Sequence, residues 1–241
     1  MNHSKLILAV DLDGTLLHPE PEAIAVWGRT RHQYMSRVAA QRLAEISQMF
    51  PIAIATARHA QTVKSLVEQL PEVNFCGFVC ENGLVYRHSL TDLSTLKQDW
   101  GAIAQSLPDW EQIDGYEQCL ALIPPKNVDR PQEVLKKVMM NANKKGFVYL
   151  DGRKIFVYPE RPDKSRGLKA LGYLSFISAG NDINDLEMLT ASHYAVTLST
   201  AHLDVKSLVE MKLGYCSQFG SHRGTEDWLS HVLSKLNELL I

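Results

Sequence analysis

The chain has 241 residues, of which 25 are lysine or arginine and 27 are aspartate or glutamate, so its formal net charge is −2. With 45% hydrophobic and 22% charged residues it has the composition of a globular protein, which excludes a disordered tail, a coiled coil and a collagen-like chain. A pI near 6.5 disfavours binding to nucleic acid through a basic surface.

Nothing near the start of the sequence predicts a membrane segment. The apolar run 6–10 has five residues, fewer than the roughly 20 of a transmembrane helix and the roughly 7 of the hydrophobic region of a signal peptide. The four cysteines have the spacing of neither a zinc site nor a disulfide framework, so we interpret them as buried, reduced thiols. We therefore expect a cytoplasmic protein without a membrane partner.

Apolar runs in chain order predict an α/β fold. Residues 5–10, 52–55, 75–80, 174–179 and 194–198 are continuous runs, typical of parallel strands that are covered on both faces. Between them, residues 33–49 and 63–70 have apolar side chains at helical spacing. This alternation predicts a Rossmann-like, doubly wound parallel sheet.

The alternation is interrupted between residues 86 and 159. Strand-like patterns at 116–123, 146–150 and 154–158 surround a helical pattern at 134–142. Asp151-Gly152 separates the last two strands and is a strong hairpin signal. We predict an inserted α+β subdomain over 86–159, within a core formed by 1–85 and 160–241.

Carboxylates gather at two predicted strand ends. Asp11 and Asp13 follow the first strand, and the loop with Asp182 and Asp185 follows the strand 174–179. Ligands of open α/β sheets bind at this edge, and carboxylates so close together favour a hard cation such as Mg²⁺. The alternative is a solvated turn, with Asp182 as a helix cap.

Two further features predict contacts to a phosphate group. Thr56, Ala57 and Arg58 follow the strand 52–55, where a hydroxyl and backbone N–H groups lie near a helix start. Lys164 stands at the start of a helix predicted over 165–172. Most lysines are simply surface residues, so Lys164 gains weight only from the other features.

In this order the motifs resemble the haloacid dehalogenase superfamily of phosphohydrolases. They are residues 11–15, Thr56 within 55–58, Lys164, and Gly180 with Asn184-Asp185. The position of the insertion is similar to the type-2 cap of the Cof-like, type IIB phosphatases. The stretch 151–171 resembles the cap exit of sucrose-phosphatase-like members.

The resemblance implies a Mg²⁺-dependent phosphatase that works through an aspartyl-phosphate. Asp11 is then the nucleophile and Asp13 the general acid and base. The implied metal ligands are Asp11, the Asp13 carbonyl, Asn181 and Asp185, and the implied phosphate contacts are Thr56, Ala57 and Lys164. The chain departs from the family at Asn181, where an aspartate is usual, and at Ala57, where glycine is usual.

By resemblance, the expected substrate is a small phosphorylated molecule, above all a sugar phosphate. Candidate contacts to it are Arg58, Asn184, Glu117, Arg153 and Lys154. A sugar phosphomutase and a phosphate-ester binding module with little activity stay open as alternatives; Asn181 is the feature that favours the second. We expect a monomer or a homodimer.

Overall fold

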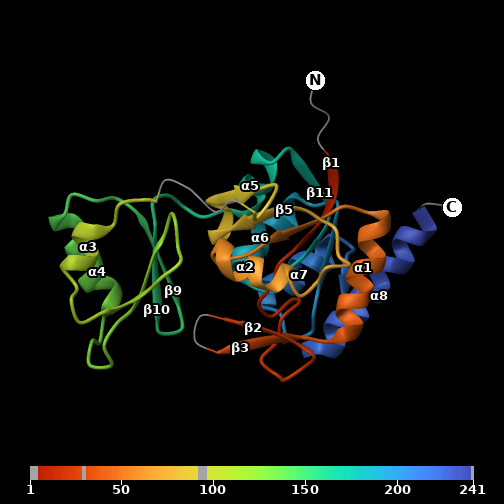
Figure 1. Cartoon of the computed structure of the whole chain (residues 1–241), viewed down its shortest axis with the longest axis horizontal. Helices are drawn as coiled ribbons and strands as arrows, with labels where there is room; N and C mark the ends of the chain where they lie inside the picture. The colour runs from red at the N-terminus through yellow and green to blue at the C-terminus, as the bar shows by residue number, and fades with distance from the viewer. Residues whose placement is uncertain (1–4, 29–30, 92–96, 240–241) are drawn as a thin grey trace. The chain divides into compact units, whose positions relative to one another are not determined.

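A computed structural model describes residues 5–28, 31–91 and 97–239 of the chain. It consists of two compact units (Figure 1). The core unit comprises residues 1–92 and 163–241, and the inserted unit comprises residues 93–162. The predicted fold class, a doubly wound α/β core with an α+β insertion, is confirmed.

A seven-stranded sheet forms the centre of the core unit, in the order β13-β12-β11-β1-β4-β5-β6. Its strands are β1 (Lys5–Val10), β4 (Ile52–Ala55), β5 (Phe75–Cys80), β6 (Val85–Arg87), β11 (Tyr173–Ala179), β12 (Tyr194–Thr197) and β13 (Tyr215–Cys216). All pairings are parallel except that of β6 with β5. The carboxyl ends of β1, β4 and β11 therefore meet at one edge.

Helices cover this sheet on both faces. They are α1 (Arg37–Met49), α2 (Ala60–Val67), α5 (Lys164–Ala170), α6 (Leu186–Ala191), α7 (Leu203–Met211) and α8 (Ser221–Leu239), with short 3₁₀ turns η1 (Glu81–Gly83) and η2 (Ile183–Asp185). Ile7 and Ala9 of β1 pack with Leu168 of α5 and Met188 of α6. Helices α1 and α8 pack on each other (Figure 1). Within the described ranges, no helix is long and apolar enough to cross a membrane.

The helix predicted over 33–49 begins later, at Arg37. Residues 32–35 instead form β3 (His32–Met35), which pairs antiparallel with β2 (Ile24–Trp27). Ser36 separates the two elements, because its hydroxyl accepts a hydrogen bond from Ala39 N and so caps the helix. The apolar spacing over 33–49 is typical of a helix, although its first residues form the strand β3 and Ser36 caps the helix that follows.

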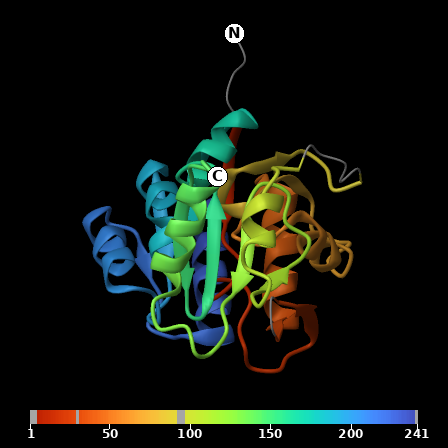
Figure 2. The same cartoon turned by 90° about the vertical axis from the view of Figure 1, so that its left-hand side faces the viewer.

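The inserted unit is a four-stranded antiparallel sheet with two helices. The sheet order is β7 (Glu111–Ile113), β8 (Leu120–Ile123), β10 (Lys154–Tyr158), β9 (Phe147–Asp151). Helices α3 (Gly101–Gln105) and α4 (Pro131–Asn141) share a buried apolar cluster with this sheet; Figure 2 shows the unit from the helix side. The predicted β9–β10 hairpin is confirmed, whereas only 120–123 of the predicted strand 116–123 is extended in a ladder.

The start of the insertion differs from the predicted residue 86. Residues 85–87 form β6 and pair with β5 in the core sheet, so they belong to the core unit. At the other boundary, residues 160–162 group with the inserted unit. A role for this unit as a cap over the site stays a prediction.

We predict that Gly83→Ala lowers the free energy of unfolding far more than Gly172→Ala does. Both glycines have positive φ, +103° and +80°, which costs an alanine about 1–2 kcal/mol. A Cβ at Gly83 would also overlap the carbonyl group of Asp163, whereas a Cβ at Gly172 meets no atom within 4 Å. Urea denaturation should show an additional loss of at least about 2 kcal/mol for Gly83→Ala. Equal losses for the two variants would contradict this account of the loop that packs on the start of α5.

Candidate active site

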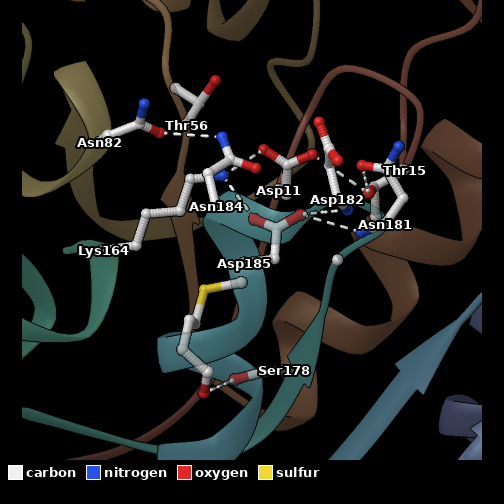
Figure 3. A network of polar contacts seen from close by, with 12 residues as sticks. Asp11, Thr15, Thr56, Asn82, Lys164, Ser178, Asn181, Asp182, Asn184 and Asp185 are labelled. Carbon is white, nitrogen blue, oxygen red and sulfur yellow. Dashed lines mark hydrogen bonds and ion pairs between the residues drawn. The ribbon is translucent and has the colours of Figure 1, made fainter. Parts of the chain in front are cut away.

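Three loops meet at the carboxyl edge of the core sheet (Figure 3). Asp11 directly follows β1, Thr56 follows β4, and residues 180–182 follow β11. Asp11 N donates to Ala179 O at 3.0 Å, so the first loop leaves the sheet still bonded to the end of β11. The parallel register thus brings together residues that are distant in the sequence.

Lys164 links two of the carboxylates at this edge. Its Nζ donates to Asp11 Oδ1 and to Asp185 Oδ1, both at 2.6 Å. The lysine and Asp185 are fully buried, and Asp11 is 4% exposed. We call these three residues the Lys164 bridge. With all three ionised, the bridge carries a net charge of −1 in a buried place, which favours the uptake of a cation or a proton.

The environment of the bridge shifts two pKa values. Burial, together with the negative charge of Asp185, raises the pKa of Asp11 from its ordinary value to about 7, although Lys164 opposes this shift. Burial disfavours the charged form of Lys164, but the two carboxylates outweigh it and raise the pKa of the ammonium. Lys164 therefore stays charged, and Asp11 is the group of this pair that takes up a proton near neutral pH.

Asp185 fixes the loop that precedes it as well as Lys164. Its Oδ2 accepts hydrogen bonds from Asn181 N at 2.9 Å and Asp182 N at 3.0 Å. Asp182 is exposed and caps η2, with its Oδ1 accepting from Ile183 N at 2.8 Å. Both oxygens of Asp185 are therefore engaged within the protein.

A second ion pair holds Asp13. Arg58 Nε and Nη2 donate to the two carboxylate oxygens of Asp13, each at 2.7 Å, and Arg58 Nη1 donates to Trp27 O at 3.0 Å. The arginine side chain is 2% exposed, whereas that of Asp13 is 45% exposed. The two-pronged geometry of a guanidinium and a carboxylate is the strong form of this interaction. It ties Asp13 to the hairpin β2–β3.

Hydrogen bonds also order the loop after β4. Thr56 O accepts from Asn82 N at 2.9 Å, and Thr56 Oγ1 accepts from Arg58 N at 3.2 Å. Asn184 Nδ2 donates to Asn82 Oδ1 at 3.1 Å (Figure 3). The predicted phosphate contacts Thr56 and Ala57 thus lie on a loop that is bonded to η1, and Asn184 contacts η1 as well.

The oxygens at the end of β1 suit a hard cation. The end of the Asn181 side chain lies 3.0 Å from Asp13 O and 3.2 Å from Asp11 Oδ2. Among residues 5–28, 31–91 and 97–239, no group of three or more His, Cys, Asp or Glu residues could hold a metal ion. The oxygens beside the Asn181 side chain are a carboxylate oxygen of Asp11 and the backbone carbonyl oxygen of Asp13, and both are kinds of ligand that Mg²⁺ accepts.

Some contributors to this region were not singled out from the sequence. Thr15 Oγ1 donates to Asp11 Oδ2 at 3.1 Å, and Thr15 O accepts from Thr225 Oγ1 of α8 at 2.7 Å. The Thr225 hydroxyl is also 2.7 Å from Nε2 of the buried His18. Only the position of a hydroxyl in the first motif hinted at Thr15, and nothing in the sequence indicated Thr225.

Three residues predicted to contact the substrate belong to the inserted unit and are described within it. Glu117 is buried, and its backbone carbonyl accepts from Gln98 N at 2.8 Å. Arg153 Nη2 donates to Pro124 O at 3.1 Å. Lys154 begins β10. Their roles toward a substrate stay predictions.

Comparisons with known proteins concern the family and the fold of this chain. The model of the haloacid dehalogenase-like hydrolase family matches residues 8–99. None of the curated proteins matches the sequence. Solved structures share the fold at low identity. A Thermotoga maritima protein is 14% identical, with a TM-score of 0.70 and coverage of 94% of this chain and 97% of that chain. A haloacid dehalogenase-like hydrolase from Bacteroides thetaiotaomicron is 14% identical, with a TM-score of 0.68 and coverage of 95% and 99%.

A sugar phosphatase of haloacid dehalogenase subclass IIB is also similar. It is 15% identical, with a TM-score of 0.61, and the alignment covers 95% of this chain and 98% of that chain. Together, the sequence match and the fold confirm the resemblance to haloacid dehalogenase-like hydrolases.

We predict that Asp11→Asn stabilises the protein increasingly as the pH rises from 4 to 8 in the presence of a metal chelator. In the folded protein the pKa of Asp11 is about 7, above its ordinary value of 3.8, so folding takes up a proton between these values. The contribution of Asp11 to stability is present below about pH 4 and is lost as the pH rises through about 7. Asparagine has no such dependence. Thermal unfolding should show a growing difference in Tm, and the exposed substitution Asp204→Asn on α7 is the control. A difference that does not change with pH would refute the assignment.

Proposed function

We propose that this chain, which has the fold of the haloacid dehalogenase-like hydrolases and matches their sequence over residues 8–99, hydrolyses a small phosphate monoester. The observation that carries the proposal is Asp11, a buried carboxylate held by Lys164 at the sheet edge, with Asp13 on the same loop. Two carboxylates placed in this way can serve as a nucleophile and as a general acid and base, which supports the proposal.

In the first step, an oxygen of Asp11 attacks phosphorus in line with the ester oxygen. The bond from phosphorus to the leaving oxygen breaks, and Asp13 gives its proton to that oxygen. An aspartyl-phosphate and an alcohol result. In the second step, Asp13 removes a proton from water, the water oxygen bonds to phosphorus, and Asp11 leaves as a carboxylate. The sum is ester plus water giving alcohol plus phosphate.

Arg58 sets a condition on these proton transfers. Its two hydrogen bonds occupy both carboxylate oxygens of Asp13. Asp13 must therefore leave at least one of them before it can carry a proton to the leaving oxygen. The half-exposed position of Asp13 gives its side chain room for this movement, while the buried Arg58 stays in place. We propose that Arg58 holds the Asp13 side chain in position whenever Asp13 is not transferring a proton.

The charge on the phosphate group is met by Lys164, Thr56 and the backbone N–H of Ala57. Lys164 supplies an ammonium that already contacts the nucleophile. Thr56 supplies a hydroxyl proton at the neighbouring strand end. These are positioning and electrostatic contributions, which account for most of the catalysis of phosphoryl transfer.

Mg²⁺ fits the residues present, with Asp11, the Asp13 carbonyl and Asn181 as proposed ligands. When bound, it neutralises charge on the phosphate oxygens. Asp185 was predicted as a further ligand. We propose that it holds Lys164 instead, because it is fully buried and accepts from three N–H donors, the Lys164 ammonium and the backbone N–H groups of Asn181 and Asp182.

The proposed substrate class is a sugar phosphate. This rests on the resemblance and on the similar protein that is described as a sugar phosphatase. In this proposal the inserted unit acts as the cap, and Glu117, Arg153 and Lys154 contact the leaving group. A phosphate-ester binding protein without turnover is a second candidate, favoured by Asn181 in place of the usual aspartate.

We predict that the purified protein with Mg²⁺ releases phosphate from at least one member of a panel of sugar phosphates, polyol phosphates, phosphoglycolate and nucleotides. Asp11→Asn should lower kcat by about 10³-fold or more, because it removes the nucleophile. Asp13→Asn should lower it similarly, because it removes the acid and base. Asp204→Asn makes the same chemical change on the surface of α7 and should have no effect. Tight binding of esters without release of phosphate would favour the binding protein instead.

A further inference from the structure

The side chain of Asn181 lies among oxygen atoms. Its terminal amide atom is 3.0 Å from Asp13 O, 3.2 Å from Asp11 Oδ2 and 3.0 Å from Thr15 Oγ1. The first two of these oxygens are the proposed ligands of Mg²⁺. The amide therefore borders the place where the cation would bind.

The side-chain amide of Asn181 makes different hydrogen bonds with these oxygens in its two orientations. With Oδ1 toward Asp11 and Asp13, the amide oxygen accepts from Thr15 Oγ1 but otherwise faces only acceptors. Oxygens that converge in this way repel one another unless a cation lies between them. With the amide turned over, Nδ2 donates to the same oxygens and no cation is needed.

The side-chain amide of Asn181 can turn over, whereas its backbone is fixed. Its backbone N–H donates to Asp185 Oδ2 at 2.9 Å, and its carbonyl accepts from His202 N at 2.8 Å. Gly14, with φ of +81°, lies against the amide, and a Cβ there would overlap it. The backbone is held on both sides, and the glycine provides the space for the amide group.

We propose that Asn181 is a two-position ligand: its NH₂ group donates to Asp11 and Asp13 O in the metal-free protein, and the amide turns over to offer its oxygen when Mg²⁺ binds. This inference rests on the proposed function, in which that cation takes part. An aspartate in this position would bind the cation with a second negative charge, but would place two carboxylates together when the cation is absent.

The inference has a consequence for stability as well as for affinity. The metal-free protein satisfies its own site, so it does not depend on the cation to fold. Its affinity for Mg²⁺ is lower than that of a site with two carboxylates, because the ligand charge tunes affinity in oxygen sites. Asn181 thus lowers the affinity for Mg²⁺ and stabilises the metal-free protein.

The test compares the unmodified protein with Asn181→Asp, using Mg²⁺ alone as the probe. We expect Asn181→Asp to lower the Kd for Mg²⁺ by about tenfold or more in isothermal titration calorimetry. We also expect it to lower Tm in EDTA and to enlarge the rise in Tm on adding Mg²⁺. Asn74→Asp makes the same chemical change at an exposed residue before β5, at the other end of the strands, and should alter neither quantity.

A second variant keeps the inference testable if Asn181→Asp is unstable. Asn181→Ala removes both the donor and the ligand, so it should lower Tm in EDTA and also raise the Kd for Mg²⁺. If Asn181→Asp folds only in the presence of Mg²⁺, this result supports the inference most strongly. An unchanged Kd for Asn181→Asp, or an unchanged Tm in EDTA for both variants, would overturn the inference.

These measurements are independent of hydrolysis. If the protein releases phosphate from an ester but Asn181→Asp binds Mg²⁺ no more tightly, the inference fails and the proposed function stands. If the titrations behave as expected and no ester is hydrolysed, the function fails and the two-position ligand stands.

Discussion

The ammonium group of Lys164 is the contact on which the site depends. It joins the end of β1 to η2 through two hydrogen bonds of 2.6 Å, and it does so from the first residue of α5. Buried carboxylates need a cation to offset their lost hydration, so removal of the Lys164 ammonium, which would leave Asp11 and Asp185 buried without one, costs about 3–5 kcal/mol. The start of α5 is in turn fixed by the close approach of η1 at Gly83. Three segments that are separate in the sequence are therefore held in one geometry by one charge.

Much of this arrangement could be predicted, because strand ends can be recognised from composition. Runs of apolar residues identify strands that are covered on both faces, and polar residues directly after them lie at a known edge. Asp11, Thr56 and the loop 180–185 follow from this argument alone, and the structure places them at that edge. Lys164 is different. It begins a helix rather than following a strand, so only the order of the motifs distinguished it from a surface lysine.

What escaped prediction depends on how side chains turn within the edge. The ion pair of Arg58 was not predicted: its three hydrogen bonds go to Asp13 and Trp27 O, and a contact of Arg58 with substrate stays a prediction. The spacing 33–49 reads as one helix because a strand of four residues is too short to show a period of its own, and the cap at Ser36 is visible only from its hydrogen bond. The amide of Asn181 is a sharper case. The sequence reveals the missing charge, but not that the amide fills the same space with hydrogen-bond donors.

The contact between α8 and the first loop has a consequence for the order of events during synthesis. Thr15 O accepts its hydrogen bond from Thr225, which the ribosome adds 210 residues later. Trp228, fully buried, also points its Nε1 at the same carbonyl, at 3.5 Å. At about 5–20 residues per second this interval lasts about 10–40 s. A nascent chain that already contains Asp11, Thr56 and even Lys164 thus lacks the support of its nucleophile loop until its last helix has emerged, and the earliest part of the site to be made is among the last to be completed.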